Sequence, residues 1–147
     1  MPTMGFWDII YSHDGLRRTF GGTVVGTVCG FSFGGVDAAK VVGLTAKDGA
    51  NALNLHNIMK KLVDPKLMQA FFKHQLKVTG CFGVFFGSYQ CARWALDKHY
   101  PILDDEQQTF IACAAALAPV LPTRVMRRNL PWALALVGFD WWNGSLK

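Results

Sequence analysis

The chain alternates long, nearly uncharged apolar blocks with shorter charged segments. The first block, residues 19–36, contains no charged residue. A helix of that length spans roughly 27 Å at 1.5 Å per residue, which is close to the thickness of a bilayer hydrocarbon core. Three further blocks follow, at residues 78–96, 107–123 and 129–143. The fourth reaches spanning length only if Asp140 and the two tryptophans after it form its interfacial end. This pattern predicts an all-α fold, a four-helix transmembrane bundle in one membrane domain, residues 1–147.

Small residues recur at every fourth position in the first two blocks. Residues four apart lie nearly above one another on a helix, so they leave a groove into which a second helix can pack. Each interior glycine costs a soluble helix about 1 kcal/mol relative to alanine, whereas a bilayer keeps such a segment helical because lipid offers the backbone no hydrogen bonds. A glycine-rich loop or a buried soluble helix is the alternative. The expected helix-packing positions are Gly22, Gly26, Gly30 and Gly34 of the first block, which we expect to pack on Gly83 and Gly87 of the second.

The faces of these helices that point away from the glycines carry aromatic side chains. We expect Phe31, Phe33, Phe82 and Phe86 to meet lipid or partner helices.

Between the first two blocks, residues 50–77 have the spacing of an amphipathic helical connector. Apolar residues between 55 and 62 keep helical spacing, and Asp64 followed by Pro65 predicts the N-cap and first position of a second helix. Such a connector can lie in the membrane interface and bind an anionic phospholipid such as cardiolipin, since each lysine contributes about 1 kcal/mol near a charged surface. A solvated loop is the alternative. The basic residues expected to contact lipid or a partner are Lys60, Lys61, Lys66, Lys73, Lys77 and Arg93.

Composition and charge agree with a membrane protein. The chain is 51% hydrophobic and 17% charged, against about 25% charged residues in an average soluble domain. Seven lysines lie between residues 37 and 77 and three arginines between 124 and 128, so these two connectors hold ten of the 15 basic residues. By the positive-inside rule, both connectors face the compartment of insertion and both termini face away. The net charge of +5 therefore indicates topology, and no nucleic-acid partner is predicted.

The residues that usually carry chemistry are scattered. None of the four histidines has a carboxylate or cysteine at ligand spacing, so we predict no metal site. Buried cysteine is usually a small hydrophobe, although an interhelix disulfide such as Cys29 with Cys91 stays open. The acidic run at residues 104–106 suits a helix N-terminus better than a catalytic pair. The sequence predicts no catalytic residue, no cofactor-binding residue and no cofactor, which favours a protein that is not itself an enzyme.

The order of these features resembles a known family. A glycine-ridged first block, a long connector, an acidic stretch and an alanine-rich third block surround a second block that reads GCFGVFFGSYQCARWALDKHYP. Together they are similar to the channel subunits of the mitochondrial inner-membrane protein translocases, the TIM family. The resemblance covers roughly residues 17–144. It implies a multi-pass protein of the mitochondrial inner membrane, with four tilted helices and both termini towards the intermembrane space, inserted without a cleaved signal.

Two departures distinguish the branches of that family. Translocase members resemble one another in an acidic residue of the second span, shortly before a basic one. Here Ser88, Tyr89 and Gln90 occupy that stretch, while Arg93 matches the basic position. The opening FWDIIYSHDGLRRTF is similar to that of the branch that contains an accessory subunit of respiratory complex I.

The resemblance therefore implies a non-catalytic accessory membrane subunit of a respiratory complex. Its partners are then the other membrane subunits of that complex and anionic phospholipid. A subunit of an inner-membrane protein translocase, or a structural subunit of another respiratory assembly such as the ATP synthase, is the alternative.

Overall fold

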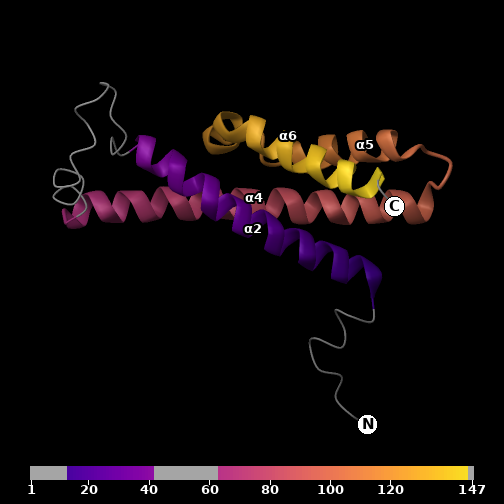
Figure 1. The fold of residues 1–147 in the computed structure, drawn as a ribbon, viewed down its shortest axis with the longest axis horizontal. Coiled ribbons are helices and arrows are strands. Elements are labelled where there is room, and N and C mark those ends of the chain that lie inside the picture. Colours follow the sequence, from indigo (N-terminus) through magenta and orange to yellow (C-terminus); the bar gives the residue numbers. More distant parts are fainter. Residues whose placement is uncertain (1–12, 42–62, 146–147) are drawn as a thin grey trace, which may run out of the picture.

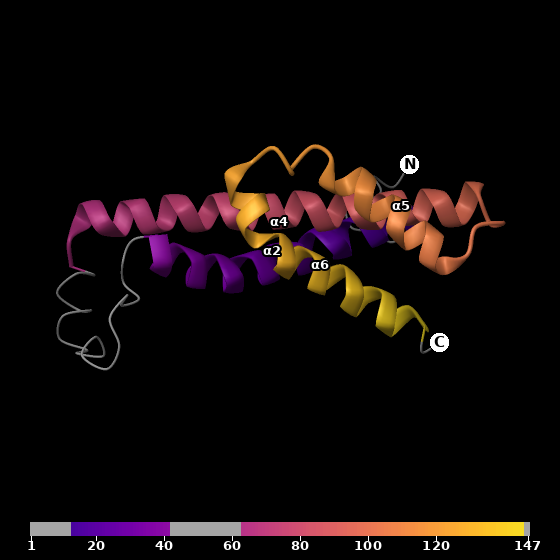
Figure 2. The ribbon, with the colours of Figure 1, turned by 90° about the horizontal axis from the view of Figure 1, so that it is seen from above.

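The computed structural model describes residues 13–41 and 63–145. In this part of the chain there are four helices and no strand, which confirms the predicted all-α class for the described residues. The helices are α2 (Asp14–Val41), α4 (Pro65–His99), α5 (Asp105–Leu117) and α6 (Arg124–Ser145). Figures 1 and 2 show α4 as the long axis of the molecule, with α2 crossing it obliquely. The α5 and α6 helices lie along the half of α4 that ends at His99 (Figure 1).

The helices α2 and α4 are antiparallel and make the most extensive contact between any two elements. At the start of α2, Gly15 lies against the indole of Trp94, and near its other end Gly34 lies against Val78. A side chain at Gly15 would come within 2.8 Å of the indole ring. The first predicted block lies wholly within α2, which begins and ends outside it.

The glycines of α2 face side chains and backbone of α4. A methyl group at Gly22 would lie 2.5 Å from the Cγ of Gln90, and one at Gly30 would lie 2.7 Å from the Cβ of Phe82. At Gly26 the space for a side chain is taken by the backbone carbonyl of Phe82. Real Cβ atoms do not approach other atoms so closely, so any side chain here must push the two helices apart.

The glycines of α4 face threonines of α2. A methyl group at Gly83 would lie 2.7 Å from the Oγ1 of Thr27, and the corresponding space at Gly87 is taken by the Oγ1 of Thr23. Both hydroxyls donate to the carbonyl four residues earlier, at 2.7 Å for Thr27 and 2.9 Å for Thr23. The expectation that the glycines of one helix face those of the other is therefore corrected: each groove receives larger residues of the other helix.

The helix α4 is continuous from the predicted connector through the predicted second span. The Asp64 side chain accepts a hydrogen bond from the backbone N–H of Lys66 at 3.0 Å, and Pro65 occupies the first turn, as expected for this N-cap. No glycine or proline follows until Gly80, so nothing ends the helix at residue 77. Residues 65–77 share the axis of residues 78–99, and the rest of the predicted connector, residues 50–62, lies outside the described residues.

The helix α5 is shorter than the predicted block 107–123. It begins with two acidic residues in its first turn, which suits the positive end of the helix dipole. It ends at Leu117, two residues before Pro119, which has no backbone N–H with which to continue the helical hydrogen bonds. Its 13 residues correspond to about 20 Å of helix.

The helix α6 begins earlier than predicted and covers the whole block 129–143. Its first turn is capped by Thr123, whose Oγ1 accepts a hydrogen bond from the backbone N–H of Met126 at 3.2 Å. Pro131 lies inside the helix without ending it.

The core lies between α4 and the α5–α6 pair. Phe82, Phe85 and Tyr89 of α4 are fully buried, and they pack in one cluster with small residues of α5 and α6. The expectation that Phe82 and Phe86 face outward to lipid or partner helices is wrong, since they are 0% and 3% exposed. The physical reason is that α4 has neighbours on two sides, α2 on one and the α5–α6 pair on the other. Between residues 78 and 90 of α4, only Gly80 and Val84 are exposed.

The other two phenylalanines of that expectation lie on α2. Phe33 is partly buried and stacks on Trp132 of α6, with ring centroids 4.6 Å apart. Phe31 is 61% exposed.

Among the described residues, one helix is long and apolar enough to cross a membrane, the Asp14–Lys40 stretch of α2. Only 22% of its most apolar part is buried within the structure. The helices α4, α5 and α6 fall short of the same measure of length and composition.

Candidate functional site

A cluster of polar side chains joins α4, α5 and α6 near the end of α4. Tyr89 and Arg93 lie one turn apart on the same face of α4, with Gln90 beside them. Asp140 of α6 and Asp105, from the first turn of α5, complete the group. We call these five residues the arginine cluster.

Arg93 and Asp140 hold the arginine cluster together. The Nη1 of Arg93 donates to the Oδ2 of Asp140 at 3.0 Å, while its Nη2 pairs with the Oδ1 of Asp105. Asp140 also accepts from the hydroxyl of Tyr89 at 3.1 Å and from the Nε2 of Gln90 at 3.0 Å. Both oxygens of its carboxylate are thus hydrogen-bonded.

The arginine cluster is largely shielded from solvent. Tyr89 is fully buried, and the side chains of Arg93 and Asp140 are 14% and 29% exposed. Asp105, at 52%, is its exposed edge. A charge at such a position is tolerated only when it is paired and hydrogen-bonded. The arrangement therefore locks three helices together and leaves no free nucleophile or base.

A second polar cluster joins α2, α4 and α6 at the opposite end of the helices. Its centre is Asp37 of α2, whose side chain is 7% exposed. The Oδ2 of Asp37 lies 2.7 Å from the Nε2 of His74, and its Oδ1 lies 3.1 Å from the Nε of Arg128. Asn129 donates to the same carboxylate at 3.4 Å. The arginine cluster fixes the end of α6 to α4, and this second cluster fixes the start of α6 to α2.

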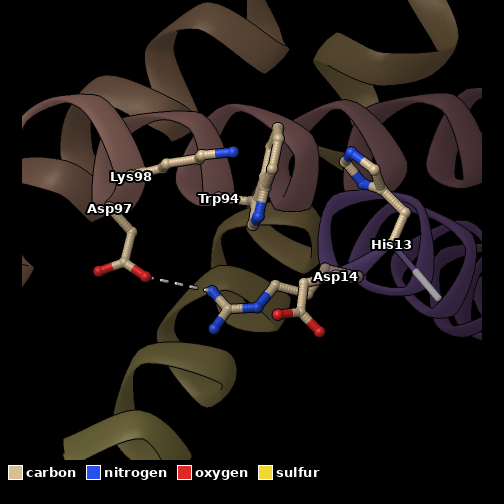
Figure 3. A pocket seen from close by; sticks show the side chains of 6 residues that line it. His13, Asp14, Trp94, Asp97 and Lys98 are labelled. Carbon is tan, nitrogen blue, oxygen red and sulfur yellow. Dashed lines mark ion pairs between the residues drawn. The ribbon is translucent and has the colours of Figure 1, made fainter. Parts of the chain in front are cut away.

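A cavity of about 420 Å³ lies where the start of α2 meets the end of α4. Figure 3 shows Trp94 standing between Lys98 and His13. The Nζ of Lys98 is 5.2 Å from the centre of the indole ring, and the His13 ring is 5.5 Å from it. Arg18 and Asp97 pair across the cavity at 3.7 Å (Figure 3). The contact between His13 and Trp94 and the ion pair between Arg18 and Asp97 therefore join the two helix ends beside this cavity.

The predicted packing and contact residues lie at different places in the fold. The six packing glycines lie at the contact between α2 and α4. Arg93, expected to contact lipid or a partner, lies inside the arginine cluster. Lys66, Lys73 and Lys77 are exposed along α4, whereas Lys60 and Lys61 lie outside the described residues.

Sequence reasoning missed the acidic partners of both clusters. The sequence pattern predicts that Asp140 lies at the interfacial end of the fourth block and that Asp37 begins a connector. Each is the single acidic residue within or beside an otherwise apolar stretch. Because an ionisable residue in a membrane segment usually faces a partner inside the protein, Asp140 could have been paired with Arg93 from the sequence alone.

Other chemistry is limited in the described residues. They contain no group of three His, Cys, Asp or Glu side chains that could hold a metal ion. All four cysteines are free, so the disulfide between Cys29 and Cys91 that the sequence left open is not formed.

Comparison of the chain with models of protein families, with curated proteins and with solved structures finds no match.

Proposed function

We propose that this chain is a non-catalytic accessory membrane subunit of mitochondrial respiratory complex I, NADH:ubiquinone oxidoreductase. In this proposal it supports the assembly and stability of the membrane arm. It lies in the inner membrane as a multi-pass protein with both termini towards the intermembrane space. Other membrane subunits and anionic phospholipid are its partners, and it binds no cofactor.

The observation that carries the proposal is the reversed distribution of side chains on α2. Large apolar residues face outward along this helix, each between 44% and 61% exposed: Val24, Val25, Val28, Phe31 and Val36. The face towards α4 holds glycines, and the charged Asp37 is buried. A soluble helix places its apolar stripe inward and its polar side outward. Outward apolar residues with inward polar ones are what a lipid environment favours.

The hydrogen bonds of the polar side chains also support a location in the membrane. Thr19, Thr23, Thr27 and Ser32 of α2 all donate their hydroxyl hydrogens to carbonyls one turn earlier in the helix. In the described part of the chain, the Oγ1 of Thr79 is the only buried side-chain nitrogen or oxygen without a hydrogen bond. Such complete hydrogen bonding is required in a bilayer core, because each unsatisfied polar group there costs several kcal/mol.

The close approach of α2 and α4 is also typical of membrane helices. Glycine brings helix backbones together where the hydrophobic effect cannot, so that van der Waals contact replaces it. In water the same glycines would weaken both helices.

The arginine cluster favours a scaffold over a translocase. A subunit that guides a polar chain through the membrane needs charged groups that are free to meet it. Here the carboxylate of Asp140 is bound by Tyr89, Gln90 and Arg93. With the resemblance of the opening residues to the complex I branch, this closed network supports the accessory-subunit assignment.

Separation of intact complexes tests the proposal. Mitochondrial membranes are solubilised in a mild detergent and resolved on a native gel, and mass spectrometry identifies the proteins that migrate with this chain. We expect it in the band with NADH dehydrogenase activity, and its depletion should lower the amount of that band. Migration with a preprotein translocase or with the ATP synthase would replace the proposal by the corresponding alternative. Release of the chain by alkaline carbonate would exclude all three.

A further inference from the structure

A second cavity, of about 570 Å³, opens between α4 and the segment that leads from α5 into α6. Its volume falls in the range of small-molecule binding sites, about 300–1,000 Å³. Its walls are mainly apolar: Leu76 and Val84 of α4 lie on one side, and Val120 lies on the other. Gly80 of α4 has no other atom within 4 Å of the position of a side chain, so the groove is open there.

Two cations stand at this groove and no acidic residue lines it. Lys77 comes from α4 and Arg124 from the first position of α6. Both are exposed. Within the described residues, neither takes part in an ion pair, whereas Arg93, Arg128 and Arg18 each face a carboxylate. Arg124 also lies where the positive end of the α6 dipole adds to the field.

The charged and apolar parts of the groove are separated along α4. Lys77 precedes Val84 by seven residues, or about 10 Å of helix. In the proposed orientation, Lys77 and Arg124 lie at the same membrane surface, because they adjoin the two basic connectors that face the compartment of insertion. Gly80 and Val84 then lie deeper, at the level of the acyl chains.

We propose that this groove binds one acidic phospholipid. The phosphate lies against Lys77 and Arg124, and an acyl chain runs over Gly80 between Val84 and Val120. An anion with an attached apolar chain fits both halves of the groove, whereas a helix of a partner protein would leave the two cations unpaired unless it carried acidic residues. The inference rests on the proposed membrane location of the chain.

Lipid retention tests the inference on the full-length chain. The protein is placed in nanodiscs of phosphatidylcholine and phosphatidylglycerol at four to one and then re-extracted. Native mass spectrometry counts the phosphatidylglycerol that stays bound. We expect the double variant Lys77→Gln and Arg124→Gln to lower retention about 25-fold, since each cation contributes on the order of a fivefold preference for anionic lipid. The matched control, Arg17→Gln with Lys40→Gln, removes the same charge from exposed positions of α2 outside the groove and should retain lipid like the unmodified chain.

A second pair of variants distinguishes lipid binding in the groove from a general attraction of anionic lipid to the basic residues of the protein. Gly80→Phe fills the groove without changing any charge, and it should also abolish retention. Gly21→Phe is its control on α2, because a side chain there meets no other atom within 4 Å. Equal retention in Gly80→Phe and Gly21→Phe, or in the two double variants, overturns the lipid site.

Two further outcomes distinguish a lipid from a protein partner in the groove, and failure of this inference from failure of the proposed function. Loss of a partner subunit from the native complex in Gly80→Phe, with phosphatidylglycerol still bound, assigns the groove to a protein helix and overturns the inference. Carbonate extraction distinguishes failure of the proposed function. A chain that stays in the membrane but binds no lipid in the groove refutes this inference alone, whereas a chain that carbonate releases refutes the proposed function with it.

Discussion

Gly26 of α2 lies where the helix comes very close to the backbone of α4, and even one added side-chain carbon there would prevent this contact. The space of its missing side chain contains the backbone carbonyl of Phe82, which cannot rotate away as a side chain can. We predict that Gly26→Leu lowers the free energy of unfolding by about 2 kcal/mol or more, because overpacking forces the backbones apart. Thermal unfolding in detergent measures the change. In cells the variant with Gly30→Leu added should fail to assemble.

The matched control is Gly21, which lies five residues earlier on α2 and faces outward. A side chain at Gly21 meets no other atom within 4 Å, so Gly21→Leu should leave unfolding unchanged or raise its midpoint, since leucine is the better helix former. If both variants unfold alike, the close contact between α2 and α4 does not stabilise the protein.

For single residues, the sequence shows where glycines recur along a helix, but it does not show which residues of the other helix they contact. Spacing of four places Gly22, Gly26 and Gly30 on one face of a helix, and that needs only the helical period. It does not tell that Phe82 fills the groove, because the offset between two helices depends on which side chains interlock. The same limit explains why the sequence predicts that Phe82 faces outward to lipid or a partner helix, whereas it is buried.

At the scale of elements, the arginine cluster couples α6 to α4. We predict that Asp140→Asn or Arg93→Gln alone lowers stability by about 2–4 kcal/mol, since each breaks the partly buried Arg93–Asp140 pair. The two together should cost less than the sum of the single variants, with a coupling energy of about 1–3 kcal/mol. A double-mutant cycle in thermal or denaturant unfolding measures it.

An exposed ion pair provides the comparison for this cycle. Arg18 and Asp97 are 3.7 Å apart, with side chains 47% and 61% exposed, so their coupling should stay below about 1 kcal/mol. Equal coupling energies in the two cycles would mean that shielding from solvent does not strengthen the Arg93–Asp140 pair. The arginine cluster would then not be what stabilises the contact between α6 and α4.

The helices themselves were largely predictable, and their ends less so. The N-cap at Asp64 followed from its position before Pro65, because capping is a local property. The end of α5 at Leu117 could have been read from Pro119, but the apolar block was extended past it. The sequence pattern does not predict that α4 continues across residue 77. The change there from an amphipathic to a uniformly apolar segment looks like the boundary between two helices, although no residue ends the helix at that point.

At the scale of the whole molecule, the directions of the helices fix which ends share a side. The helices α4 and α6 run from the end marked by Asp37 towards the end marked by Arg93, and α2 runs the other way. The start of α2 and the end of α6 therefore lie at the same end of the structure, as Figure 1 shows. This agrees with the orientation that the distribution of basic residues predicts.

We therefore expect tags added at the two termini to behave alike. In mitochondria with an intact outer membrane, added protease should cleave neither tag, and after rupture of the outer membrane it should cleave both. A tag inserted after Val41 should stay protected until the inner membrane is opened. Cleavage of only one terminal tag in ruptured mitochondria would contradict the proposed orientation.

The uninterrupted length of α4 has a mechanical consequence. Its 35 residues extend about 52 Å, whereas the hydrocarbon core of a bilayer is about 30 Å thick. In the proposed orientation, roughly 20 Å of rigid rod stands clear of the lipid at the Asp64 end, depending on tilt. A neighbour that grips this projection also sets the depth and tilt of the buried end, where Arg93 holds α5 and α6. The helix then acts as a lever, and a displacement on one side of the membrane is transmitted to the other without any hinge between them.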